Sequence, residues 1–382
     1  MGRPKGSKIK KTIEKMAKKA IKKTPKKVLV ILGLILIIGI LVWGYFNKDL
    51  ILSYLKDDTP EIKVVGDVAY LVEEGSVAEE VKVTFLELFR DNNVSQIGDS
   101  IFIESGDIDI LIDAGEKGSG SYTVVPFLEE HVEDKILELV VITHADSDHL
   151  GGMVGVSAAY GALEIPGFTY LYLIDYGYEA TTDLHADYVE LREGLESKGT
   201  VCYSMKDVFC ETPKSNAASR FYLGVDTYLD FLDYKTYAMD EIDDDNDRSV
   251  ACLLTHDEVR MLFTGDAEKE EEKYLTELKI GKVNLFKSNH HGSPTSNTKA
   301  FLDTIRPDYI VIQSNEDNKH ELPKKVVVAR LQEYTDNVYA TFVSGNITFV
   351  SKNNQLTVTA QRPLISVDES NWYLADDPEN PR

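Results

Sequence analysis

Four potential metal ligands fall within six residues, in the segment His144-Ala145-Asp146-Ser147-Asp148-His149. The apolar run LELVVIT, typical of a buried strand, comes directly before them. A strand end followed by a tight loop lets side chains converge on one point, and a histidine entering the next helix can face a second point beside it. Two imidazoles and two carboxylates suit a pair of divalent cations that share ligands. Taken alone, the segment could also be a solvated polar loop with a helix cap.

Three other segments place chemically capable side chains at the ends of predicted strands. Asp113 follows Leu111-Ile112, Asp266 follows Leu262-Phe263-Thr264-Gly265, and His290 and His291 follow the strand VNLFKSN. Four of the eight histidines lie in these segments or in the first one. Groups at strand ends along one edge of a sheet form a shared cleft, so the sequence predicts a metal site there.

The elements that position these residues alternate between strands and helices, with several hairpins, which indicates an α/β layered domain with mixed sheets. A composition of 43% hydrophobic and 27% charged residues excludes a wholly disordered or collagen-like chain. The sequence predicts five segments: a basic cytoplasmic head (1–27), a transmembrane helix (28–46), a stalk or extra strand (47–80), one large domain (81–362) and an acidic tail (363–382).

The motifs occur in a specific order: Gly98-Asp99-Ser100 with IDAG, then HxDxDH, then FTGDAE, then HHGSPTS. This ordered set resembles the metallo-β-lactamase-fold hydrolases, and within them the extracellular domain of the ComEC competence proteins and its free-standing relatives. The similarity runs from about Val81 to Gln361. It implies a four-layer αββα sandwich with the metals at one edge, between the two sheets.

The resemblance also implies roles for individual residues. His144 and Asp146 would bind the first cation, Asp148 and His149 the second, and Asp266 would bridge the two. His291 is favoured over His290 as the remaining ligand, with little to separate them. The catalytic residues would be Asp148 and His290, and the outer contacts to ligands or substrate would come from Asp113, Asp99, Ser293 and His320.

Two departures from the superfamily pattern concern the first cation. Asp146 stands where the superfamily usually has histidine, and only His185 is available as a further histidine between this loop and Asp266. The first site is therefore expected to be the weaker one. Carboxylate in place of imidazole hardens the site, so the two divalent cations are expected to be Zn²⁺ or Mn²⁺.

Residues 28–46 form nineteen consecutive uncharged positions. As a helix they would cover about 28 Å, close to the thickness of a hydrocarbon core. Twelve basic residues and one acidic residue precede or lie in this stretch, so the positive-inside rule predicts a single-pass protein of the cell membrane with a cytoplasmic N-terminus and an extracellular domain. A cleaved signal peptide and a nucleic-acid-binding head are the alternatives.

Positions 47–382 carry 29 basic and 63 acidic residues, the remainder of the totals of 41 and 64, a net charge of −34. So acidic a chain is a poor general binder of polyanions. The predicted activity is a phosphodiesterase or nuclease-like hydrolysis, in which a hydroxide held between two cations attacks a phosphoester in a nucleotide, a nucleic acid or a phospho-headgroup. DNA would need a local basic patch, for which Lys282, Lys287 and Lys299 are candidates.

Two other functions stay open. The same fold could hydrolyse an amide, a lactam or a thioester, or it could be a metal-binding scaffold without turnover. Among the three cysteines, Cys202 and Cys210 could close a small loop, whereas Cys252 lies in the apolar run VACLL and is expected to be buried and inert.

Overall fold

The structure is a computed structural model that describes residues 63–65, 67–157, 159–210, 213–214 and 216–368. These residues lie in the compact unit Ile62–Arg382. The basic head and the predicted membrane span at 28–46 fall outside the described residues. Within the described part of the chain, no helix combines the length and the apolar character that crossing a bilayer requires.

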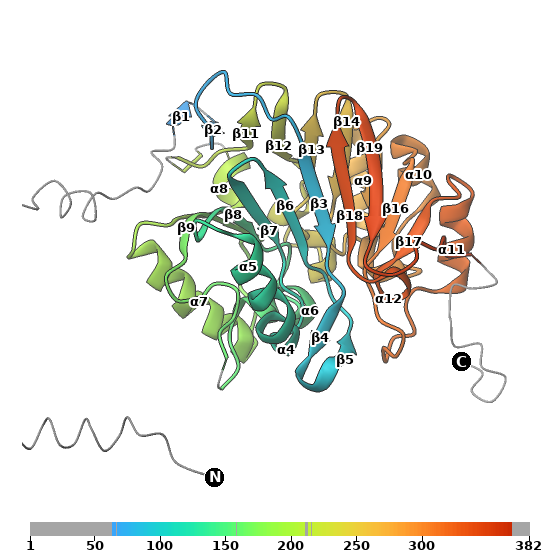
Figure 1. Ribbon diagram of the computed structural model, residues 1–382, viewed down its shortest axis with the longest axis horizontal. Helices are drawn as coiled ribbons and strands as arrows, with labels where there is room; N and C mark the ends of the chain where they lie inside the picture. The colour runs from blue at the N-terminus through green and yellow to red at the C-terminus, as the bar shows by residue number, and fades with distance from the viewer. Residues whose placement is uncertain (1–62, 66, 158, 211–212, 215, 369–382) are drawn as a thin grey trace, which may run out of the picture. The chain divides into compact units, whose positions relative to one another are not determined.

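Most strands belong to two large sheets (Figure 1). The nine-stranded sheet contains, in spatial order, β1 (Lys63–Val65), β2 (Val68–Tyr70), β11 (Arg220–Gly224), β12 (Thr227–Phe231), β13 (Cys252–His256), β14 (Val259–Phe263), β15 (Leu285–Lys287), β16 (Tyr309–Ile312) and β17 (Val338–Ala340). Strands β14 to β17 are parallel to one another, and β11 to β14 are antiparallel. The strands β1 and β2 therefore extend this sheet through the parallel pairing of β2 with β11.

The eight-stranded sheet contains, in spatial order, β10 (Val201–Ser204), β9 (Thr169–Asp175), β8 (Ile136–Val141), β7 (Ile108–Ile112), β6 (Ile101–Ser105), β3 (Val81–Phe85), β18 (Ile347–Lys352) and β19 (Gln355–Ala360). Strands β7 to β10 are parallel, whereas the remaining neighbours pair antiparallel. A separate hairpin is formed by β4 (Leu88–Arg90) and β5 (Val94–Gln96).

Helices flank the two sheets, with α5 and α7 beside the eight-stranded sheet and α9 to α11 beside the nine-stranded sheet (Figure 1). The helices are α4 (Lys117–Ser119), α5 (Val125–His131), α6 (Ser147–Leu150), α7 (Asp183–Glu196), α8 (Met205–Phe209), α9 (Lys269–Glu277), α10 (Lys299–Ile305), α11 (Lys325–Gln332) and α12 (Thr341–Ser344). Short helical turns complete the set: η1 (Asp91–Asn93), η2 (Gly120–Val124), η3 (Gly151–Met153), η4 (Thr236–Ala238), η5 (Asp245–Arg248) and η6 (Asn289–Gly292).

The hydrophobic core lies between the two sheets. Aromatic side chains from opposite sheets meet there: Phe85 of β3 lies 6.2 Å from Phe263 of β14, and Tyr172 of β9 lies 5.0 Å from Phe221 of β11, between ring centroids. All five residues of β7 (Ile108–Ile112) are buried, and four of them are apolar. This is expected of a strand that is covered on both faces of its sheet. The architecture is an α/β sandwich, as the sequence predicts.

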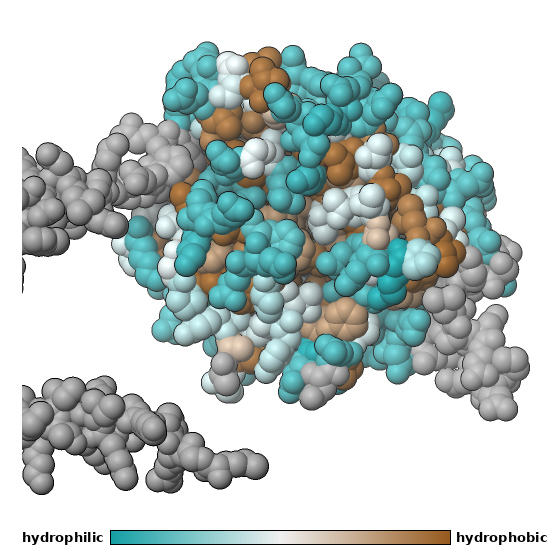
Figure 2. Space-filling model, in the orientation of Figure 1, coloured by the Kyte–Doolittle hydropathy of each residue, from teal (hydrophilic) through white to brown (hydrophobic). Residues whose placement is uncertain are grey.

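The surface is largely polar. Figure 2 shows hydrophilic residues over most of one face, with apolar side chains interspersed among them. None of the three cysteines, which all lie within the described residues, forms a disulfide: Cys202 and Cys252 are buried and Cys210 is exposed. The loop that a Cys202–Cys210 disulfide could close is therefore not cross-linked, and the expectation that Cys252 is buried is confirmed.

The topology brings the predicted site residues to one edge of the sandwich. Asp113, His144, Asp266 and His291 all follow strands of the parallel segments β7, β8, β14 and β15. Parallel strands end at the same edge, so these side chains gather even though they come from two sheets. Asp99 precedes β6, and because β6 is antiparallel to β7 its beginning lies where β7 ends.

Candidate metal centre

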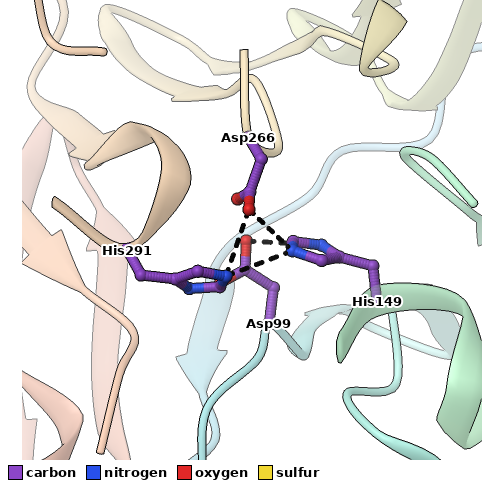
Figure 3. A group of neighbouring side chains, drawn as sticks. All are labelled: Asp99, His149, Asp266 and His291. Carbon is purple, nitrogen blue, oxygen red and sulfur yellow. Dashed lines mark hydrogen bonds and ion pairs between the residues drawn. The ribbon is translucent and has the colours of Figure 1, made fainter. Parts of the chain in front are cut away.

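Four buried side chains meet at this edge: Asp99, His149, Asp266 and His291 (Figure 3). One ligand atom from each lies within 4.8 Å of the others. Asp266 Oδ2 lies 3.2 Å from His149 Nε2 and 3.1 Å from His291 Nε2, and the two Nε2 atoms are 3.3 Å apart. The arrangement directs two imidazoles and a carboxylate at one point.

The outer nitrogen of each of these imidazoles is already engaged. His149 Nδ1 lies 2.8 Å from Asp113 Oδ2, and His291 Nδ1 lies 2.8 Å from the carbonyl oxygen of Gln313. Each Nδ1 must donate its proton to these acceptors, which leaves a lone pair on each Nε2 when the imidazole is neutral. Two lone pairs that face each other beside a carboxylate fit a cation between them, which is the donor set that Zn²⁺ or Mn²⁺ accepts.

The pKa values of the cluster also indicate a site for positive charge. Burial disfavours a charged imidazole, yet Asp266 and Asp99 raise the pKa of His149 and of His291 well above the ordinary value. Burial likewise disfavours the carboxylate of Asp266, but the two histidines and Lys287 hold its pKa well below its ordinary value. The cluster therefore holds positive charge where the lone pairs converge, either as protons or as a cation that displaces them.

Asp148 and His144 extend the cluster on either side. Asp148 Oδ2 lies 3.2 Å from His291 Nε2. The side chain of Asp148 is 23% exposed, so it is more accessible than the carboxylates of Asp99 and Asp266. His144 is fully buried, its Nδ1 lies 3.0 Å from Thr143 Oγ1, and its Nε2 has no hydrogen-bond partner among the described residues. Burial and the neighbouring His149 lower the pKa of His144 well below its ordinary value. A neutral imidazole with a free Nε2 is what a second cation would require.

Asp146 lies at the rim of this site, with an exposed side chain. The surrounding protein and the charge of Asp148 raise the pKa of Asp146 to about 6. The structure therefore does not bring Asp146 into the four-residue cluster, and of the predicted first-cation pair only His144 is buried beside it, with its ring 4.0 Å from that of His149. His185 lies elsewhere, on α7, where its Nδ1 is 2.8 Å from the hydroxyl of Tyr176.

His290 points to a different partner from His291. Its Nδ1 lies 2.9 Å from Glu268 Oε1, and its Nε2 lies 3.9 Å from Asp266 Oδ2. Glu268 also accepts a hydrogen bond from Thr295, whose hydroxyl bonds Ser293 at 2.7 Å. Hydrogen bonds from His290 and Thr295 lower the pKa of Glu268 although burial opposes this. An ionised Glu268 thus orients a partly exposed imidazole beside the cluster, which suits proton transfer.

Asp113, which the sequence predicts to orient a ligand, is buried and accepts three hydrogen bonds. It receives hydrogen bonds from the backbone N–H and the hydroxyl of Thr143 as well as from His149. His320, in contrast, is exposed on the loop after β16. Partial burial and the adjacent Lys319 lower its pKa.

Lys287 is the functional residue that sequence reasoning misplaced. It ends β15 and is fully buried, not part of a surface patch. Its Nζ forms ion pairs with Asp99 and, at 3.1 Å, with Asp266 Oδ1, and it donates to the carbonyl of Gly265 at 2.8 Å. Asp266 therefore presents only Oδ2 to the histidines. Lys287 is therefore not part of the predicted patch, whereas Lys282 and Lys299 are exposed and form surface ion pairs with Asp308 and Glu333.

The backbone is strained where the centre is built. His290 (φ 47°, ψ 50°) and His291 (φ 51°, ψ 23°) are both left-handed, a conformation that costs about 1–2 kcal/mol for each residue with a side chain. Such strain persists where the surrounding structure enforces it, commonly at functional sites. Gly98 has φ +138°, and a Cβ there would lie 2.4 Å from the carbonyl oxygen of Asp148, so only glycine lets Asp99 reach the cluster.

The sandwich and its edge of histidines and aspartates are those of the metallo-β-lactamase fold, and the family model described as Metallo-beta-lactamase superfamily matches residues 96–199. The fold and the buried Asp/His cluster indicate divalent metal binding and a metal-dependent hydrolase.

The curated relatives include a protein named as a competence protein, and the comparisons confirm the resemblance to the ComEC competence proteins. Recombination protein 2 of Haemophilus influenzae is 25% identical over 270 residues, which cover 69% of this chain and 28% of that protein. Competence protein ComA of Neisseria gonorrhoeae is 26% identical over 259 residues, 66% of this chain and 30% of that protein. The chain thus spans less than a third of the length of the curated relatives it matches.

Among solved structures, the metallo-beta-lactamase fold protein YhfI from Bacillus subtilis covers 68% of this chain and 95% of its own, at 13% identity and a TM-score of 0.40.

Proposed function

We propose that this protein is a membrane-anchored, extracytoplasmic phosphodiesterase that acts on nucleotides or short nucleic acids with two divalent cations, Zn²⁺ or Mn²⁺. The observation that carries the proposal is the pair of facing Nε2 atoms of His149 and His291 beside Asp266 Oδ2. The similarity to competence proteins supports a nucleic-acid-derived substrate. When bound, such cations polarise phosphoryl oxygens and lower the pKa of water.

The residues of the chain would divide the work between binding and proton transfer. His149, His291, Asp266 and Asp148 would hold one cation, and His144 with Asp146 would contribute to a weaker second site. Asp113 and Gln313 keep the two imidazoles oriented by accepting from Nδ1. His290, held by Glu268 and 23% exposed, would donate a proton to the leaving oxygen.

A small phosphoester is favoured over a long duplex. Lysines that could have tracked a DNA backbone are paired or buried, and phosphate neutralisation by Lys and Arg dominates the affinity of long polyanions. A nucleotide or the end of a short strand needs few such contacts. The remaining candidates are hydrolysis of an amide, lactam or thioester, and metal binding without turnover.

Metal analysis of the purified chain combined with a substrate screen tests this proposal. We expect the chain to hydrolyse bis-p-nitrophenyl phosphate and the dinucleotide TpT. EDTA should abolish this activity and Mn²⁺ or Zn²⁺ should restore it, because the histidines bind the cation and the cation polarises the phosphate. Hydrolysis of nitrocefin without either phosphodiester would favour the lactam alternative. Bound metal with no hydrolysis at all would favour the scaffold.

Topology has a separate test. With lysines before the span at 28–46 and an acidic domain after it, we expect protease added to intact cells to digest residues beyond 47. Protection in intact cells and digestion only after lysis would show the inverted orientation.

A further inference from the structure

A cavity of about 350 Å³ lies between the hairpin β4–β5 and the loop that follows β16. Arg90 and Gln96 line it from the ends of the two hairpin strands, Asn315 and Lys319 line it from the loop, and Glu116 closes it next to α4. The hairpin lies beside α4 and α6 at one edge of the molecule (Figure 1). None of these five residues belongs to the metal centre.

The chain connects this cavity directly to the metal centre. Strand β5 continues through Ile97 and Gly98 into Asp99, whose backbone N–H donates to the carbonyl of Asp148 at 3.1 Å. Glu116, which also lines the cavity, lies near enough to Asp148 that burial and the charge of Asp148 together raise the pKa of Glu116. The wall of the cavity at Ile97 is therefore two residues from Asp99, whose backbone bonds Asp148, the partly exposed carboxylate of the centre.

Two basic side chains at the cavity, Arg90 and Lys319, are available to bind an anion. Arg90 and Lys319 are exposed, and neither forms an ion pair with another residue of the described ranges. Both are close enough to Glu116 to act on its pKa in the lowering direction. Two carboxylates, Glu116 and Asp317, also line the cavity, so its positive charge is confined to the side chains of Arg90 and Lys319. Such a pair fits one compact anion and not a long polyanion, and the fork of an arginine matches the oxygens of a phosphate.

The cavity also offers an unused acceptor. Asn315 is 4% exposed, its Nδ2 donates to the carbonyl of Ser95 at 3.3 Å, and in the part of the chain that the structure describes its Oδ1 has no hydrogen-bond partner. A buried oxygen without a donor is costly, and a ligand N–H or O–H would satisfy it. A nucleotide carries both a phosphate and such donors.

We propose that this cavity is a subsite for the terminal phosphate of a nucleotide or short oligonucleotide, which Arg90 and Lys319 bind while the adjoining phosphodiester lies at the metal centre. The proposal rests on the phosphodiesterase function proposed above and adds its specificity. Cleavage would then be favoured next to a terminal phosphate.

A comparison of the dinucleotides pTpT and TpT tests the subsite through a ratio. For the wild-type chain we expect kcat/KM to be about 10-fold or more higher for pTpT, the value of one or two charge-assisted hydrogen bonds. In R90Q/K319Q this ratio should fall to about one. The control K198Q/K273Q removes the same charge from exposed lysines elsewhere and should keep the preference. A wild type without the preference, or a double variant that retains it, would overturn the subsite.

Binding without metal separates this proposal from the proposed function. Thymidine 3′,5′-bisphosphate titrated calorimetrically into the full chain in EDTA should bind about 10-fold or more weakly to R90Q/K319Q than to wild type or to K198Q/K273Q. If the wild type hydrolyses neither dinucleotide in the presence of metal, the phosphodiesterase proposal fails and this binding difference still decides the subsite. Equal affinities in all three proteins would refute it.

Discussion

Replacing Asp266 by asparagine is expected to remove bound metal and to lower kcat/KM by about 10²-fold or more, as the loss of a metal-holding group does. Asp266 Oδ2 lies 3.2 Å from His149 Nε2 and 3.1 Å from His291 Nε2. Asparagine keeps the shape of the side chain but loses the negative charge that draws a cation between the imidazoles.

The measurement is metal content per chain after dialysis, together with kcat/KM on bis-p-nitrophenyl phosphate. Asp257→Asn serves as the matched control, since Asp257 lies in the turn between β13 and β14 with a partly exposed side chain and φ 54°, which asparagine tolerates. Circular dichroism should show that both variants are folded. Unchanged metal content in the folded Asp266→Asn variant would remove this carboxylate from the centre.

Replacing Lys287 by methionine is expected to lower the free energy of unfolding of the metal-free protein by about 3–5 kcal/mol. Its ammonium is buried against Asp99 and Asp266, and these two carboxylates keep its pKa above the ordinary value although burial opposes this. Methionine fills a similar volume, so the cost comes from two buried carboxylates that lose their counter-charge and from the lost bond to the carbonyl of Gly265.

Urea denaturation in EDTA provides the measurement, with Lys282→Met as the control. Lys282 pairs with Asp308 at 2.7 Å, but its side chain is 62% exposed, and exposed pairs contribute about 0–1 kcal/mol. The two variants should therefore differ by several-fold in their loss of stability. A loss below about 1 kcal/mol in both would mean that Lys287 does not support the carboxylate pair.

Much of the fold and the location of the site follow from local sequence. An apolar run such as LELVVIT is typical of a strand that is buried on both faces of its sheet. Potential ligands that directly follow such a run therefore lie at the end of a strand. The gathering of Asp113, His149, Asp266 and His291 at one edge was predictable for this reason, since each is within a few residues of a parallel strand end. The residue types at this edge then favour the binding of a divalent metal.

The tertiary structure decided which side chains face one another. Lys287 reads in the sequence as a charged strand end near the surface, and its burial depends on Asp99 and Asp266, which come from distant parts of the chain. The adjacent histidines differ only because left-handed backbone turns His291 into the cluster and His290 towards Glu268. Glu268 itself carries no signal in the sequence beyond its place after Asp266.

The place of strands β1 and β2 and the cavity near the centre depend on pairings that no local pattern records. The strands β1 and β2 join the nine-stranded sheet through β11, and the cavity forms where the hairpin β4–β5 meets the loop that carries Asn315 and Lys319. Sequence periodicity reports which face of a segment is buried, because burial acts on each residue separately. It does not report the partner, because a long-range contact is fixed only when the whole chain has closed around its core.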